Sequence, residues 1–243
     1  MRRSALVVVA FSIVATNVAA AQIFGAEPRE TSARSGWGLD VAFQVAQPVR
    51  EFADNIDVAF GVGSSVRHHF SWFRPLGLRG DFAIMNYGNE RQDVPLSSTV
   101  NRVTVEMNTS NNVLLAGGGP ELAVMRGPVR PYVHGFLGYS YFFTESSAGY
   151  ENGGGTFARS TNFSDGGFAT GGGAGVRMPL RARSTEISID GGARFMRNGV
   201  RSYLSEGDVI DRADGTLDFT PRTTNADFWV YYLGISLDFG RRR

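Results

Sequence analysis

The sequence predicts an all-β protein, an eight-stranded antiparallel up-and-down transmembrane β-barrel. Three observations predict it: an export signal at the start, eight segments in which large apolar residues alternate with small or charged ones, and connections that are alternately short and long. The segments run over about 10–14 residues, whereas strands of soluble proteins have a mode near 5–6. Roughly 10 residues cross an apolar band of about 25 Å at a tilt near 40°.

Residues 1–21 have the layout of a secretory signal peptide. Arg2 and Arg3 give a positive end, an apolar run covers residues 5–14, and residues 19–21 are small alanines before Gln22. The run is too short for a membrane-spanning helix, which needs about 20 residues. We therefore expect cleavage after residue 21.

Composition narrows the class of protein further. The sequence has no cysteine, so neither a disulfide framework nor a lipid-anchored cysteine is available, and this favours a Gram-negative envelope. Without Arg2 and Arg3, 22 basic residues face 23 acidic ones, which leaves no basic excess to suggest nucleic acid as a partner. The 31 glycines are nearly double the usual share of about 7%. We expect a short periplasmic segment over residues 22–35 and one barrel over residues 36–243.

Six of the eight segments alternate with a clear phase, at residues 37–46, 56–70, 76–85, 168–178, 186–195 and 229–239. The segments at 113–124 and 131–144 are less regular, because Gly117, Gly118, Gly119 and Pro120 interrupt the first, and their inward or outward phase stays open. Short connections lie at 72–75, 127–129 and 181–183, and longer ones at 86–110, 144–166 and 198–227, with a modest one at 48–55. Aromatic residues near the segment ends match interfacial girdles: Trp37, Phe70, Trp72, Tyr87, Phe143 and Trp229. A secreted soluble β-sandwich is the alternative.

Charged residues recur on the small-residue side of these segments. In a barrel this side faces a narrow interior, where isolated charges are costly and must pair. We expect either a plug of ion pairs or, alternatively, an ion path or gate. The predicted interior charges are Asp40, Asp57, Arg67, Arg79, Asp81, Glu121, Arg177, Glu186, Asp190, Arg194 and Asp238.

Three other motifs invite a functional interpretation. Residues 171–175 (GGGAG) resemble a phosphate-binding turn, but no helix pattern follows, so we expect these glycines to make room for aromatic or arginine side chains. His68 and His69 are adjacent and face opposite sides of a strand, and His134 has no evident triad partners, so we expect no metal site and no catalytic site. Acidic residues at positions 208, 211, 214 and 218 lack the spacing of an EF-hand. They allow weak cation or lipopolysaccharide contact, or an ordinary solvated loop.

Two segments carry a family resemblance. Residues 130–140 (RPYVHGFLGYS) resemble the PYVGAGLGY strand of small bacterial outer-membrane barrels, and residues 228–239 resemble the C-terminal assembly signal of that superfamily. The expected assembly residues are Leu233, Ile235, Leu237 and Phe239. The resemblance is to OmpA, OmpX and OmpW-like eight-stranded barrels, although Gly240 and three arginines follow Phe239. We expect no OmpA-type peptidoglycan-binding domain.

The resemblance implies a location in the cell outer membrane, with outer-membrane lipid, lipopolysaccharide and the barrel-assembly machinery as partners. No cofactor is expected. The leading hypothesis is a non-catalytic protein with a structural or surface-interaction role through extracellular loops, whose ligand the sequence does not name. The alternatives are a narrow channel for small or apolar solutes and, third, an enzyme that modifies outer-membrane lipid.

Overall fold

The computed structural model describes residues 36–95, 104–150, 156–182, 185–205, 207–211 and 217–239. The predicted signal peptide and the terminal arginines lie outside these residues. The described strands are β1 (Trp37–Pro48), β2 (Ala59–His69), β3 (Leu76–Pro95), β4 (Thr104–Ala123), β5 (Arg130–Tyr150), β6 (Thr156–Ala182), β7 (Thr185–Arg197), β8 (Val200–Tyr203), β9 (Val209–Asp211), β10 (Leu217–Phe219), β11 (Arg222–Asn225) and β12 (Phe228–Phe239), with the 3₁₀ helix η1 at Arg50–Asp54. No described helix is long and apolar enough to cross a membrane.

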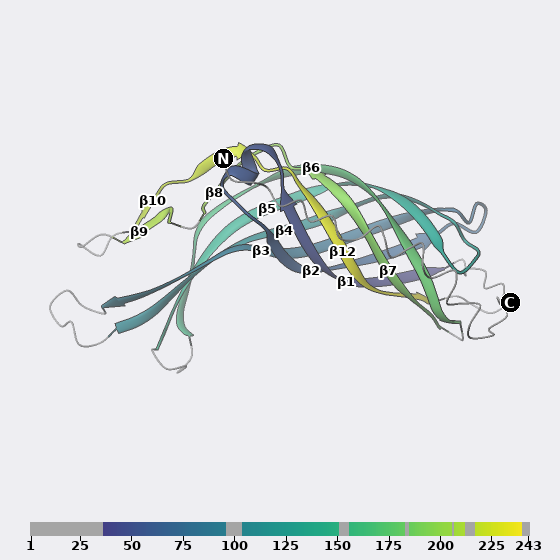
Figure 1. The fold of residues 1–243 in the computed structure, drawn as a ribbon, viewed down its shortest axis with the longest axis horizontal. Helices are drawn as coiled ribbons and strands as arrows, with labels where there is room; N and C mark the ends of the chain where they lie inside the picture. Colours follow the sequence, from purple (N-terminus) through teal and green to yellow (C-terminus); the bar gives the residue numbers. More distant parts are fainter. Residues whose placement is uncertain are drawn as a thin grey trace, which may run out of the picture.

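Eight of the described strands close into a barrel in the order β1-β12-β7-β6-β5-β4-β3-β2, every pair antiparallel (Figure 1). The last barrel strand pairs with the first along its whole length, from Trp37 opposite Phe239 to Pro48 opposite Phe228. Closure satisfies the backbone groups that an open edge would expose to lipid. The predicted fold class is confirmed.

The outer surface of the barrel is apolar. Phe168 is 81% exposed and Leu233 is 64% exposed, and seven of the eight barrel strands carry exposed large apolar side chains, whereas those of β7 are partly exposed. A soluble sandwich would bury these residues, since water-facing patches of this size are rare. In a membrane they form the lipid-facing belt, and the aromatic residues Phe70, Trp72 and Phe73 stack at its short-turn end. The alternation predicted for the six regular segments is confirmed within the observed strands, but it fails at the start of the segment 56–70, where Ile56 was predicted to face outward and is buried before β2 begins. In β4 and β5 the odd-numbered residues Leu115 and Glu121 point inward, whereas Val133 and Leu137 point outward.

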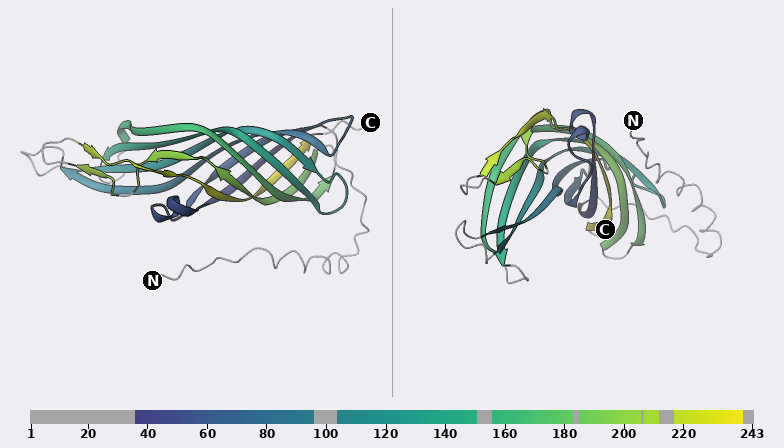
Figure 2. Two further views of the ribbon diagram at one scale, coloured as in Figure 1. Left: turned by 90° about the horizontal axis from the view of Figure 1, so that it is seen from above. Right: turned by 60° about the vertical axis from the view of Figure 1, so that its left-hand side comes forward.

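Four strands run far beyond the expected length. β3, β4, β5 and β6 have 20, 20, 21 and 27 residues, and they continue past the barrel at the end where the long connections lie (Figure 1 and Figure 2). Most of the connections predicted at 86–110 and 144–166 are therefore paired strand. The prediction relied on alternating apolar residues, and this alternation ends at the edge of the membrane. The backbone hydrogen bonds between β3 and β4 continue beyond that edge in polar sequence, as far as Pro95 opposite Thr104.

Candidate functional site: the barrel interior

The half of the interior next to the short turns holds a set of paired charges, here called the interior network. It comprises Asp40, Arg67, Arg79, Asp81, Glu121, Arg130, Arg177, Glu186, Asp190, Arg194 and Asp238, all nine-tenths or more buried. Each lies on the side of its strand that carries small residues. Glycines on that side give the long side chains room, since a Cβ at Gly175 would lie 2.6 Å from the ring of Tyr132 and one at Gly38 would lie 2.7 Å from the guanidinium of Arg67.

Arg67 of β2 binds carboxylates of the next two strands, β1 and β12. Its Nε and Nη2 donate to Asp40 at 2.9 and 2.8 Å, and its Nη1 lies 3.1 Å from Asp238 of β12. The Ser65 hydroxyl donates to an oxygen of Asp40 at 2.6 Å. These contacts tie β1, β2 and β12 together across the seam where the barrel closes.

Glu121 of β4 forms the second centre of the network. Arg177 of β6 donates to both of its oxygens, at 2.7 and 2.8 Å, in the bidentate geometry that makes the strongest arginine–carboxylate pairs. Arg79 approaches the same carboxylate at 3.4 Å and also donates to Asp81 at 2.9 Å. Arg177 in addition lies 3.9 Å above the ring of Tyr132, which adds a cation–π contact.

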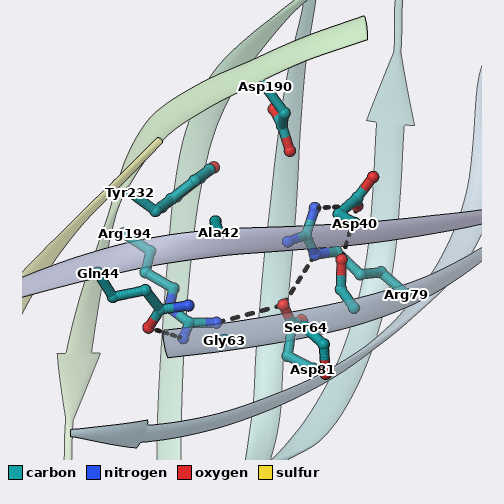
Figure 3. Close-up of a pocket in the computed structure, with 11 residues that line it drawn as sticks. Asp40, Ala42, Gln44, Gly63, Ser64, Arg79, Asp81, Asp190, Arg194 and Tyr232 are labelled. Atoms are coloured by element: carbon teal, nitrogen blue, oxygen red, sulfur yellow. Dashed lines mark hydrogen bonds and ion pairs between the residues drawn. The ribbon is translucent and has the colours of Figure 1, made fainter. Parts of the chain in front are cut away.

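A third group surrounds a small cavity of about 10 Å³, which is room for about one water molecule. Figure 3 shows Arg194 beside Gln44 at one end of this cavity and Arg79 beside Asp40 at the other. Arg194 lies 3.3 Å from both Gln44 and Asp81. The cavity is therefore small and is lined mainly by polar side chains, several of which pair with one another.

At the short-turn end, Arg130 binds Glu186 of β7 through two guanidinium nitrogens. Above this pair, Tyr132 donates to Asp190 at 2.7 Å and lies 2.9 Å from the hydroxyl of Tyr232. Among the described residues of the network, five arginines face six carboxylates, so the interior is nearly neutral as a whole. Such balance is what a buried set of charges requires.

Ten of the eleven predicted interior charges are brought together in this network. Asp57 is the exception, and its predicted inward position is wrong: it is exposed in the connection before β2, because that strand begins only at Ala59. The sequence prediction missed Arg130, Gln44 and Tyr132. Alternation along β5 places Arg130 and Tyr132 on the same face of the strand as His134. The sequence prediction did not decide whether that face points inward or outward.

The other half of the interior, next to the long connections, holds most of the buried apolar side chains. Phe52 of η1 is 3% exposed, and its ring inserts between those of Tyr203, Phe142, Tyr87 and Phe228, with centroids 5.0 to 6.3 Å away. Met85, Val113, Leu115, Met196 and Val230 complete the cluster below it. The modest connection between β1 and β2 therefore closes the mouth of the barrel with an aromatic side chain.

The histidines occupy three different surroundings. His134 is buried in the interior at 5% exposure, which removes it from the lipid that a lipid-modifying enzyme would have to reach. His69 also faces inward, 3.4 Å from Glu121, whereas His68 packs on Trp37 at the outer surface. In the described part of the chain, no three metal-ligating side chains gather into a group that could hold an ion.

In the loop between β7 and β12, Asp208 binds Arg222 at 2.8 Å and receives hydrogen bonds from the backbone and hydroxyl of Ser205. Partial burial would raise the pKa of Asp208, but the hydrogen bonds from Arg222 and Ser205 outweigh this and hold the pKa below its ordinary value of 3.8. The side chains at 211, 214 and 218 lie outside the described residues.

No protein-family model matches this chain, and no characterised protein matches it in sequence. Its fold is similar to solved outer-membrane proteins. The attachment invasion locus protein Ail of Yersinia pestis is 11% identical, with 86% of this chain and 100% of that one covered and a TM-score of 0.45. OprG of Pseudomonas aeruginosa is 14% identical, with 86% and 99% covered and a TM-score of 0.48, and a major outer membrane protein of Thermus thermophilus is 14% identical, with 83% and 99% covered and a TM-score of 0.39.

The closed barrel with its apolar belt and its buried, paired charges defines an integral β-barrel protein of the bacterial outer membrane. Its architecture is that of the small eight-stranded barrels that its sequence resembles. The residues expected as an assembly signal, Leu233, Ile235, Leu237 and Phe239, lie on the lipid-facing side of β12, paired with β1.

Proposed function

We propose that this protein is a closed, non-catalytic barrel whose role is structural or surface-interacting, through the strands and loops beyond the membrane. The observation that carries the proposal is that buried, closely packed side chains occupy both halves of the interior among the described residues. Charge pairs occupy the half next to the short turns, and Phe52 with its aromatic neighbours occupies the other half. A channel for solutes requires a continuous passage, and a cavity with room for one water does not provide it.

The connections at the barrel mouth hold each other in place, which suits a surface that binds a partner. Arg222 donates to Asn55 at 2.6 Å, the backbone of Ser202 donates to Asp165 at 2.6 Å, and the backbone of Gly207 donates to Glu90 at 3.1 Å. Two connections, those between β1 and β2 and between β7 and β12, are thus linked to each other and to the long strands β3 and β6. A surface that is ordered before binding loses less conformational entropy when a partner arrives.

Conductance in planar bilayers tests the proposal. We expect no unitary currents from the refolded protein, because water and ions have no path past the two filled halves. The Phe52→Ala variant should also be silent, since the charge network below it stays intact. Steady unitary currents from the wild-type protein would overturn the proposal in favour of a channel. A changed mass of lipid A in cells that express the protein would instead support an enzyme.

A further inference from the structure

The charges outside the barrel interior divide between its two ends. The short turns, together with the residues that follow the last barrel strand, carry seven arginines and no acidic residue, counted over 70–75, 124–129, 180–184 and 240–243. The long connections and strand extensions of the other end carry seven arginines against fifteen acidic residues, counted over 49–58, 86–112, 144–166 and 198–227. One end of the sequence pattern is basic and the other acidic, and an anionic partner suits only the first.

Three of these arginines, here called the basic rim, belong to successive strand connections. Arg74 lies in the turn between β2 and β3, Arg126 lies in the turn between β4 and β5, and Arg181 is the last residue but one of β6. The first two turns are joined, because the backbone amide of Ala123 donates to the carbonyl of Pro75 at 2.8 Å. Only β5 separates β4 from β6 in the sheet order. The arginines therefore follow one another around the same end of the barrel.

Arg74 and Arg126 are available to a partner. Both side chains are exposed, and neither forms a hydrogen bond or an ion pair with another residue that the structure describes. The five arginines of the interior network, by contrast, are each paired with a carboxylate. The chain thus supplies carboxylates for its buried arginines and none for these two, which leaves their guanidinium groups open to carboxylates from outside.

The turn that carries Arg126 is anchored to the interior network. The buried Arg130 donates from its Nε to the carbonyl of Gly127 at 3.3 Å, and its guanidinium also binds Glu186 of β7. The backbone of Gly127 has a φ of +99°, which glycine adopts without steric strain. A basic group on a backbone that is already fixed loses less conformational entropy when a partner binds.

Both exposed arginines lie past the lipid-facing belt. Arg74 follows the stacked rings of Trp72 and Phe73, and Arg126 lies two residues beyond Val124, an exposed apolar residue at the end of β4. Aromatic side chains of this kind mark the interface between the membrane and water. The short turns of outer-membrane barrels face the periplasm, so the basic rim lies at the periplasmic surface.

A partner for the basic rim must carry many carboxylates on one scaffold. A single exposed arginine–carboxylate contact contributes little, whereas several contacts with one scaffold reinforce each other. We propose that the basic rim binds peptidoglycan, the periplasmic cell-wall polymer, whose peptide stems present free carboxylates at regular intervals. The planar fork of arginine matches a carboxylate in bidentate geometry. The inference goes beyond the proposed function, which concerns the loop end, and gives the barrel a second partner on the opposite side of the membrane.

The test is co-sedimentation of the full-length protein with purified peptidoglycan sacculi. The protein is held in nanodiscs of zwitterionic phosphatidylcholine, so that no anionic lipid competes. We expect wild-type nanodiscs to sediment with sacculi at low salt and to be released as the ionic strength rises, because exposed charges are screened. Arg74→Gln with Arg126→Gln should weaken binding about fivefold. Sacculi whose carboxylates have been converted to amides should not bind the wild type.

Arg159→Gln with Arg197→Gln is the matched control, because it removes two exposed arginines from β6 and β7 toward the other end of the barrel. Heat-modifiable migration on gels establishes that each variant is folded. The proposal is overturned if the rim variant binds sacculi within twofold of the wild type, if the control loses as much, or if amidated sacculi still bind. Vesicles of phosphatidylglycerol that displace sacculi at equal charge would also overturn it, since the rim would then bind any anionic surface. Conductance, which tests the proposed function, does not depend on these residues.

Discussion

The two halves of the barrel interior are filled by opposite kinds of chemistry. Next to the short turns, Arg67, Arg177 and their carboxylate partners close the lumen with directed, charge-assisted hydrogen bonds. Next to the loops, Phe52 and its aromatic neighbours close it with packing. The stability of the charged half depends on every charge having its partner. The stability of the aromatic half depends on how well the side chains fill the available volume. The same substitution strategy, truncation to alanine, should therefore expose two different kinds of damage.

The largest effect is expected in the charged half. Arg177→Ala removes both hydrogen bonds to the buried carboxylate of Glu121 and leaves that charge poorly compensated, which typically costs about 3–5 kcal/mol. Urea unfolding of the protein in lipid vesicles, followed by tryptophan fluorescence, measures the loss. Adding Glu121→Gln to the variant should recover part of it, because the orphaned charge is then gone.

Arg159→Ala is the control for this prediction, since Arg159 is exposed on β6. Arg201 is unsuitable as a control because its side chain donates to the backbone oxygens of Phe168 and Val200. If Arg177→Ala unfolds at the same urea concentration as Arg159→Ala, the interior charges do not act as a plug. A changed ion preference in such a variant would then favour a conducting interior.

The next effect is expected in the apolar half. Phe52→Ala removes the ring at the centre of the aromatic cluster, and the lost transfer energy and the cavity together cost about 3 kcal/mol, near the low end for this change because the η1 segment can settle inward. Phe52→Leu conserves most of the volume and should cost less than about 1.5 kcal/mol. The same unfolding assay compares the two variants. Equal stability of Phe52→Ala and the wild type would show that η1 does not close the mouth.

The sequence predicted the charged half well and the apolar half poorly, for a physical reason. Each interior charge can be recognised from its position in the sequence. A charged residue that alternates with lipid-facing residues such as Phe82 and Leu78 must point to the interior, because burying a charge in lipid is costly. Apolar residues carry no such signal. Phe52 lies in a connection with no strand pattern, and Tyr203 lies in the short strand β8, which pairs with β11 inside the connection between β7 and β12.

The parts of β3, β4, β5 and β6 that extend beyond the membrane were also missed by the sequence prediction, for a related reason. Their backbone hydrogen bonds continue in polar sequence, where neither side needs to face lipid and alternation carries no information. The register shift between Asn86 and Gly88 is set by local backbone geometry together with pairing to β4. A single sequence read for periodicity locates the membrane-spanning part of such strands and misses the rest.

The smallest effect is expected outside the barrel, where Arg222 is half-exposed to solvent although its partner Asp208 is buried. Arg222 is 45% exposed, so removing it in Arg222→Ala should cost less than about 1 kcal/mol, in contrast to Arg177→Ala. The loss should depend on pH. Because the pKa of Asp208 is lower in the folded protein than its ordinary value of 3.8, the pair contributes stability above about pH 4, and this contribution disappears as the pH falls through the folded pKa. Urea midpoints at pH 7 and pH 3 should therefore differ less in Arg222→Ala than in the wild type. An Arg222→Ala variant as unstable as Arg177→Ala would contradict the distinction between exposed and buried pairs.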